Sequence, residues 1–139
     1  MITHIIRMAI RPDVTPDQVA AGLQRMAEAS SQMGPEDGVT PIVFGTDVGD
    51  GFDFGAVSTL ADLEAYEAMM THPAHLEIDR VGLPLVSRFH SFDITDDPDP
   101  EVGRRIADIH RRRFTAHPDV LELVLGLEEY RGSGVPGRD

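Results

Sequence analysis

Cysteine and lysine are both missing from this sequence of 139 residues. Without cysteine the chain can form no disulfide, no thiol nucleophile and no cysteine–zinc site. All 12 basic residues are arginine, and 24 acidic residues give a formal net charge of −12. A surface of this sign is repelled by phosphate backbones, so we expect no nucleic-acid partner.

Long apolar runs are missing as well. No stretch approaches the ~20 apolar residues that a membrane-spanning helix requires. The first residues lack the basic start and apolar core of a signal peptide. We therefore expect a cytoplasmic protein with no membrane partner. The 41% hydrophobic and 26% charged residues fit a packed globular chain rather than a disordered one.

Alternating apolar residues predict four strands, at 2–10, 39–47, 52–60 and 87–95. In the first strand, His4 shares one face with apolar neighbours such as Ile6. A helix is predicted from Pro16, capped by Thr15, to about Met33. A second helix covers about 61–71, is interrupted at His72-Pro73 and resumes over 74–85.

The order β-α-β-β-α-β is typical of the ferredoxin-like plan, an α+β fold with one antiparallel sheet. Helices cover one face of such a sheet. The other face also carries apolar side chains, namely Ile5, Val57, Phe92 and Ile94. Because an apolar face without helices needs a partner, we expect a homodimer that forms through this face.

The proline-rich segment 96–100 indicates a linker after a domain of residues 1–97. A helical C-terminal extension is predicted over 98–130, including a helix from Val120 to Tyr130, followed by a disordered tail over 131–139. The extension carries an arginine cluster: Arg104, Arg105, Arg111, Arg112 and Arg113. We expect the cluster to dock onto the acidic body or a partner subunit, and an anion-binding site is the alternative.

Several motifs occur together in a specific order. His4 stands in the opening strand, a proline opens the first helix, Gly51-Phe52-Asp53 begins the third strand, and His72-Pro73-Ala74-His75 follows the second helix. This pattern, over about residues 1–95, resembles the stress-responsive A/B barrel (Dabb) family. The resemblance implies a dimeric α/β barrel. The family contains plant stress proteins and cofactor-free enzymes such as polyketide cyclases.

The resemblance also implies roles for two histidines. In the cyclases of the family a histidine of the His-Pro-Ala-His turn acts as base, and the matching residue is His75. The first-strand histidine of their pocket matches His4. Other polar positions of the cyclase pocket differ here, because they are occupied by Met26, Phe54 and Met69.

Elementary chemistry agrees with a base at His75. The residue falls in the first turn of a helix, where the positive end of the helix dipole disfavours an imidazolium. A neutral imidazole can accept a proton. The alternative is that His75 only packs at the helix entry. His4 is polar on an apolar face, so it needs a partner, and the candidates are a ligand, water, His75 and a core group.

We predict a pocket for an apolar or aromatic small molecule, with His75 and His4 as catalytic residues. The predicted substrate-binding residues are Ile6, Met8, Gly22, Met26, Phe54, Tyr66, Met69, His72, Phe89 and Ser91. No cofactor is expected. No metal is expected at His72, His75 and His4 either, because the HxxH spacing brings only two imidazoles together, zinc requires three or four ligands, and no carboxylate is clearly aimed at them.

The leading functional hypothesis is a cyclase or lyase of the aldol or dehydration type that acts on a polyketide-like or aromatic metabolite. One alternative is a non-enzymatic, ligand-binding stress-response dimer. A second alternative is a cofactor-independent monooxygenase of aromatic substrates, since related ferredoxin-like dimers include such enzymes.

Overall fold

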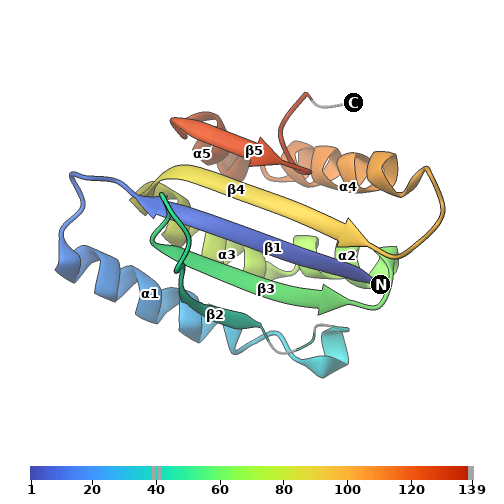
Figure 1. The fold of residues 1–139 in the computed structure, drawn as a ribbon, viewed down its shortest axis with the longest axis horizontal. Helices are drawn as coiled ribbons and strands as arrows, with labels where there is room; N and C mark the ends of the chain where they lie inside the picture. The colour runs from blue at the N-terminus through green and yellow to red at the C-terminus, as the bar shows by residue number, and fades with distance from the viewer. Residues whose placement is uncertain (39, 41, 138–139) are drawn as a thin grey trace.

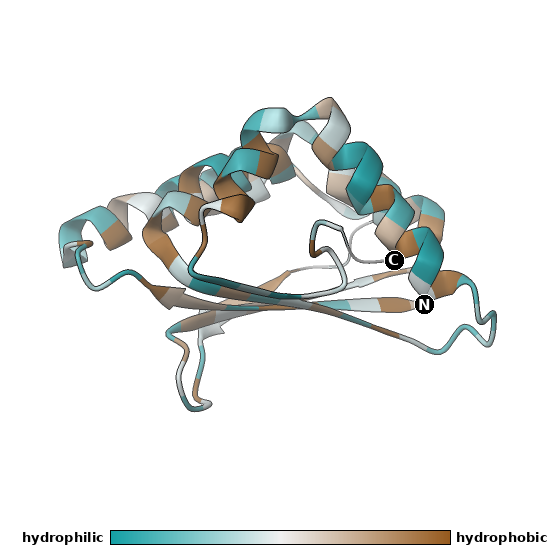
Figure 2. Ribbon diagram, turned by 90° about the horizontal axis from the view of Figure 1, so that it is seen from above, coloured by the Kyte–Doolittle hydropathy of each residue, from teal (hydrophilic) through white to brown (hydrophobic). Residues whose placement is uncertain are grey.

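A five-stranded sheet with helices packed on one side forms the protein in the computed structural model, which describes residues 1–38, 40 and 42–137 (Figures 1 and 2). The strands are β1 (Ile2–Ile10), β2 (Val43–Thr46), β3 (Phe54–Leu60), β4 (Val86–Thr95) and β5 (Glu129–Gly132). The helices are α1 (Pro16–Ser30), α2 (Leu63–Thr71), α3 (Pro73–Gly82), α4 (Val102–Ala116) and α5 (Pro118–Leu125), with short 3-10 turns η1 (Pro35–Asp37) and η2 (Leu83–Leu85).

The sheet order is β2-β3-β1-β4-β5. The first four strands are antiparallel neighbours in the ferredoxin-like order, which confirms the predicted α+β fold. β1 is central, and its register places His4 opposite Ser58 of β3 and Asp93 of β4. Figure 2 shows the helices above the sheet and the loop between β2 and β3 projecting from the other side.

Local signals set the helix starts. Thr15 and Gln18 form a capping box at the start of α1, and Asp62 caps α2 by accepting a hydrogen bond from the Ala65 amide. α2 ends at Thr71, and its C-cap His72 has the extended backbone that a residue before proline prefers. His72 then caps α3, in which Pro73 is the first helical residue.

The C-terminal part differs from the prediction. The predicted helix from Val120 to Tyr130 ends at Leu125, because Gly126 caps α5 and the chain then extends. Glu129–Gly132 forms β5 and pairs parallel to Arg88–Ser91 of β4, so the sheet has a fifth strand that is not antiparallel. β5 enters the region 131–139 that was predicted to be a tail. Residues 138 and 139 lie outside the described residues.

Two predicted strands are shorter in the structure. β2 occupies Val43–Thr46 of the predicted strand 39–47, in which positions 39 and 41 lie outside the described residues. β3 begins at Phe54, and Asp53 belongs to the turn, where its backbone amide donates to the Met8 carbonyl.

The extension shares the core with the body of the protein. Ile106 and Ile109 of α4 pack with Ile2, Leu60 and Met70 in one buried cluster. A second cluster combines Leu76 and Leu83 with Phe114, Val120 and Val124 from α4 and α5. Across residues 1–38, 40 and 42–137, no helix is long and apolar enough to cross a membrane.

Candidate functional site

A cavity of about 530 Å3 lies between the sheet and the helices. This volume falls within the roughly 300–1,000 Å3 that small-molecule sites occupy. Most lining side chains are apolar, as in most such sites. The structure brings together on its wall eight residues predicted for the site: His4, Ile6, Met8, Met26, Met69, His75, Phe89 and Ser91.

Four predicted site residues do not line the cavity. The space over Gly22 is filled by Leu85, whose Cδ1 would overlap a Cβ at position 22. Phe54 stacks on Phe44, which does line the cavity, with 6.1 Å between ring centroids. Tyr66 is fully buried and His72 is occupied as a helix cap, as described below.

The α2–α3 turn fixes the orientation of His75. His72 Nδ1 accepts a hydrogen bond from the Ala74 amide, and α3 starts between them at Pro73. His75 Nδ1 lies 3.0 Å from the carbonyl oxygen of Met69. Because a carbonyl can only accept, Nδ1 carries the hydrogen, and Nε2 of the neutral ring keeps its lone pair. A proton acceptor therefore belongs to a side chain of the cavity wall.

Burial keeps this imidazole neutral. Burial is the largest cause that lowers the pKa of His75, to about 4; Asp79 opposes the shift, and Arg113 adds to it. The His75 ring has some accessible surface because it lines the cavity, but protein atoms surround it on all sides of the cavity wall. The position at the helix N-terminus predicted a neutral His75, and burial is the largest cause of the lowered pKa of His75 in the structure.

His4 is held by a carboxylate that the sequence analysis did not identify. Its Nδ1 lies 2.8 Å from Oδ1 of Asp93, the residue opposite it in the register of β1 and β4. Both side chains are almost completely buried. Burial opposes ionisation of Asp93, but hydrogen bonds from His4, Ser133 and Tyr66 outweigh it and lower the pKa of the carboxyl group. Asp93 is thus an ionised acceptor that orients the His4 ring.

The hydrogen bonds continue from Asp93 into the extension. The Tyr66 hydroxyl lies 2.8 Å from Asp93 Oδ2 and 2.8 Å from His110 Nε2. His110 is 5% exposed and lines the same cavity as His4. We call this series of four side chains, His4, Asp93, Tyr66 and His110, the polar relay.

A buried ion pair lies on another part of the wall. The Arg113 guanidinium pairs with Asp79 and donates from Nε to the carbonyl oxygen of Met70 at 2.6 Å. Burial works against ionisation of Asp79, but Arg113 outweighs it and holds the pKa of this carboxyl group below its usual range. The two charges compensate each other beside His75.

The extension supplies part of the cavity wall. His110 and Arg113 of α4, Val124 of α5 and Tyr130 of β5 line it. The Tyr130 ring packs on Phe89, with 5.4 Å between centroids. None of these residues was predicted for the site, because the helical stripe and the arginine cluster of the extension gave no sign of the cavity.

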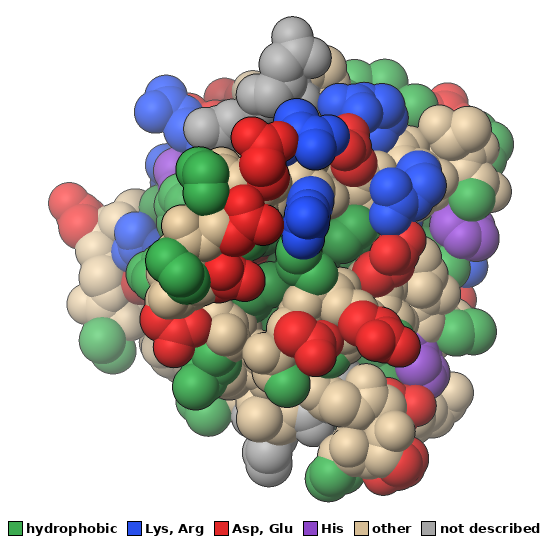
Figure 3. Space-filling view, turned by 90° about the vertical axis from the view of Figure 1, so that its right-hand side faces the viewer, with side chains coloured by type: hydrophobic (Ala, Val, Ile, Leu, Met, Phe, Trp, Pro, Cys, Tyr) green, Lys and Arg blue, Asp and Glu red, His purple; other side chains and the backbone are tan. Residues whose placement is uncertain are grey.

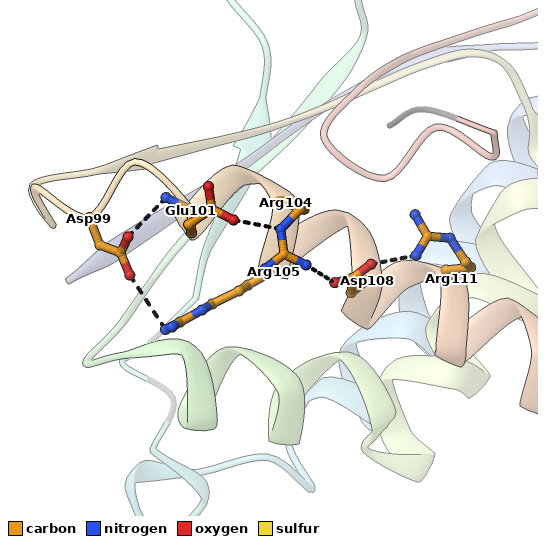
Figure 4. Close-up of polar contacts among 6 residues, drawn as sticks. All are labelled: Asp99, Glu101, Arg104, Arg105, Asp108 and Arg111. Carbon is orange, nitrogen blue, oxygen red and sulfur yellow. Dashed lines mark hydrogen bonds and ion pairs between the residues drawn. The ribbon is translucent and has the colours of Figure 1, made fainter.

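The arginine cluster is neutralised by nearby acids rather than gathered into an anion site. Within the extension the pairs are Arg104 with Glu101 and Asp108, Arg105 with Asp99, and Arg111 with Asp108 (Figure 4). Arg112 pairs with Glu67 and Arg113 with Asp79, both in the body. The side where α4 and the N-terminus lie accordingly shows basic and acidic side chains interspersed (Figure 3).

Within residues 1–38, 40 and 42–137, no three histidine, aspartate or glutamate side chains lie so that they could hold a metal ion. His72 and His75 use their Nδ1 atoms for the Ala74 amide and the Met69 carbonyl, respectively.

Comparison with known proteins identifies relatives of the first two thirds of the chain. The model of the stress responsive A/B barrel domain matches residues 2–96. Curated protein sequences gave no match.

Among solved structures, a dimeric ferredoxin-like protein of unknown function from Thermobifida fusca is 24% identical, with a TM-score of 0.59 over 68% of this chain and 89% of the other. The hydroxynitrile lyase of Passiflora edulis is 17% identical, with a TM-score of 0.56 over 69% and 94%. An antibiotic biosynthesis monooxygenase is 13% identical, with a TM-score of 0.57 over 70% and 100%.

Proposed function

The chain belongs to the stress-responsive A/B barrel domain family, and from this membership together with its cavity we propose that it is a cofactor-free small-molecule enzyme. The reaction class is that of a lyase or cyclase acting on an apolar or aromatic ligand. His75 is the base, and His4 orients the substrate. The solved structure of a lyase with the same fold supports the class but does not identify the substrate.

One observation carries the proposal. His75 donates through Nδ1 to the Met69 carbonyl, so its neutral ring holds a lone pair on Nε2 at the wall of a mainly apolar cavity. A general base requires such a lone pair within reach of the substrate. The second imidazole, His4, lines the same cavity and is oriented by Asp93.

The chemistry needs no other reagent. In the cyclising direction Nε2 of His75 takes a proton from a carbon beside a carbonyl, and the electron pair of that bond forms an enolate. The enolate carbon bonds to a second carbonyl carbon of the same ligand, and the resulting alkoxide takes the proton back from His75. In the lyase direction His75 takes a hydroxyl proton, a carbon–carbon bond breaks to form a carbonyl, and the released carbanion is protonated.

The test removes the base and retains its structural hydrogen bond. In His75→Asn the side-chain amide can still donate to the Met69 carbonyl, but nothing replaces Nε2. We expect turnover of an aromatic hydroxynitrile, or of a linear triketone, to fall about 10²- to 10⁴-fold. His117→Asn is the matched control, because this histidine lies outside the cavity wall. Full turnover by His75→Asn would remove His75 from the mechanism.

The apolar character of the wall also favours a second function, binding without conversion. Five methionines, Met8, Met26, Met33, Met69 and Met70, line the cavity and can adapt to the shape of a ligand. A metabolite that stays bound in native mass spectra and is unchanged after incubation, together with no turnover of either substrate class, would favour this function over the enzyme.

A homodimer through the outer face of the sheet completes the proposal. Val43, Val57, Ile5 and Phe92 stand opposite one another across four strands and form an apolar row on this face. Val43 is 70% exposed and the nearby Ile94 is 62% exposed. Exposed apolar rows of this kind indicate an interface, and the similar Thermobifida structure is described as dimeric. The proposed partner is a second copy of the chain.

A further inference from the structure

The polar relay connects the cavity wall to the extension, which lies beyond the region matched by the family model. Three hydrogen bonds of 2.8 Å each link His4 Nδ1 to Asp93, Asp93 to the Tyr66 hydroxyl, and this hydroxyl to His110 Nε2. All four side chains are largely withdrawn from solvent.

The hydrogens of the relay can be assigned by accounting for donors and acceptors. Asp93 is ionised, so it accepts from both the His4 Nδ1–H and the Tyr66 O–H. The Tyr66 hydroxyl has only one hydrogen, which it has given to Asp93. Its oxygen must therefore accept a hydrogen from His110 Nε2. Nδ1 of the neutral His110 ring then carries no hydrogen and has a lone pair that can accept a hydrogen bond.

The surroundings of His110 agree with this assignment. Its Nδ1 is a buried atom for which the described part of the chain supplies no hydrogen-bond partner. The backbone after β5 approaches it closely, since a Cβ on Gly134 would lie 2.8 Å from Nδ1. Burial, the largest cause, lowers the pKa of His110 to about 4, so the ring is neutral and carries a single hydrogen.

We propose that His110 is a positioning residue for His4. By donating to Tyr66, His110 fixes the hydroxyl that donates to Asp93, and Asp93 in turn holds the His4 ring with Nε2 directed away from the relay. Only the catalytic consequence of this positioning, the orientation of His4 toward a substrate, rests on the proposed function. The positioning itself concerns four side chains whose geometry is independent of the substrate.

Packing alone does not account for an imidazole at this place. His110 lies between the Tyr66 and Phe114 rings, where an apolar side chain would also fit. A buried polar atom without a partner is costly, so a residue kept only for packing would be better without Nδ1. The imidazole offers one feature that an apolar ring lacks, namely the Nε2 donor to Tyr66.

The titratable groups that face His4 come from four elements. Asp93 lies on β4, Tyr66 on α2, His75 and Asp79 on α3, and His110 with Arg113 on α4. The effect of a His110 substitution on His4 through the polar relay must therefore be distinguished from an electrostatic effect on His4 through the Arg113–Asp79 pair. A double-variant comparison at Tyr66 makes this separation.

The experiment follows the Nδ1–H resonance of the His4 ring by NMR at a fixed pH. Without the Tyr66 hydroxyl, Asp93 is a stronger acceptor for the His4 Nδ1–H, so Tyr66→Phe should move this resonance downfield. His110→Phe should shift it in the same direction by a smaller amount, because Tyr66 becomes a weaker donor. In the Tyr66→Phe background, His110→Phe should cause no further shift.

Two polar variants distinguish loss of the Nε2 hydrogen bond from a general effect of substitution on folding. The amide nitrogen of His110→Gln reaches the position of Nε2 and should restore the wild-type His4 resonance. The amide of His110→Asn reaches only Nδ1 and should behave like His110→Phe. His117→Gln is the control and should leave His4 unchanged. An unmoved His4 in His110→Phe and His110→Asn, or an equal shift in the Tyr66→Phe background, would overturn the proposal.

Failure of the positioning proposal is distinguishable from failure of the proposed function. If His75→Asn is inactive and the His4 signals do not change in the His110 variants, the proposed enzymatic function is supported and the positioning role of His110 is excluded. If the His4 signals change in the His110 variants as expected but no substrate is turned over, the positioning role is supported and the proposed enzymatic function is excluded.

Discussion

Removing the positive charge of Arg113 should destabilise the fold much more than removing that of its neighbour Arg112. Both arginines lie on α4 and both pair with an acid of the body, Asp79 for Arg113 and Glu67 for Arg112. Their burial differs. The side chains of the Arg113 pair are 5% and 13% exposed, whereas those of the Arg112 pair are 59% and 43% exposed. The two substitutions thus compare the same chemistry in two environments.

The expected magnitudes follow from this difference. Arg113→Met leaves Asp79 as an uncompensated buried charge and also leaves the Met70 carbonyl without its Nε donor. Breaking a buried pair in this way costs about 3–5 kcal/mol of unfolding free energy. Arg112→Met removes an exposed pair, which costs about 1 kcal/mol or less. A second substitution, Asp79→Leu, should return most of the loss in Arg113→Met, because no lone charge then remains.

Urea unfolding followed by circular dichroism measures these free energies, provided that the slope with denaturant is unchanged among the variants. Equal losses in Arg113→Met and Arg112→Met would refute the reasoning. So would a further loss, rather than a recovery, on adding Asp79→Leu. Either result would mean that the extension is held by its apolar contacts and that the Arg113 pair contributes nothing specific.

The remaining predictions concern pH, the proposed dimer and β5. Because the folded pKa values of His75 and His110 are lowered to about 4 from 6.5, the unfolded chain binds more protons between these values, and stability should fall as pH drops from about 6.5 to 4 in urea titrations. Ile94→Glu should convert the dimer to a monomer in analytical ultracentrifugation, and an unchanged mass would exclude the sheet face. Gly132→Ala should lower stability by more than about 2 kcal/mol in thermal unfolding, because Gly132 has φ +126° and a Cβ there would overlap the Ser91 carbonyl.

The topology was predictable because each element of residues 1–97 carries its own local signal. Strict alternation fixes which face of β1 is buried, and Thr15 with Pro16 fixes the start of α1. β5 carries no such signal. The apolar helical spacing that starts at Val120 continues through Leu127 to Tyr130, which lies within β5. Glu129–Gly132 becomes a strand only because the edge of β4 is available beside it. Tertiary contacts decide the conformation of so short a segment.

The site was predictable in part for a similar reason. His4 and His75 stand out as polar residues in apolar or helix-entry positions, and both line the cavity. Asp93 had a readable signal that was missed, since the alternation of β4 places it on the face of Ser91. His110 and Arg113 had none, because their roles depend on how α4 docks against α2 and α3.

Enclosure by the extension bears directly on the proposed role of His75 as a base. Arg113 and Asp79 act on its pKa in opposite directions, so burial dominates the low value. A ligand that lost a proton to His75 would become an anion beside the new imidazolium. At about 4 Å and an effective dielectric constant of roughly 20, the attraction is about 4 kcal/mol, equivalent to roughly three pKa units. The enclosure that keeps His75 neutral therefore also strengthens the ion pair formed on proton transfer.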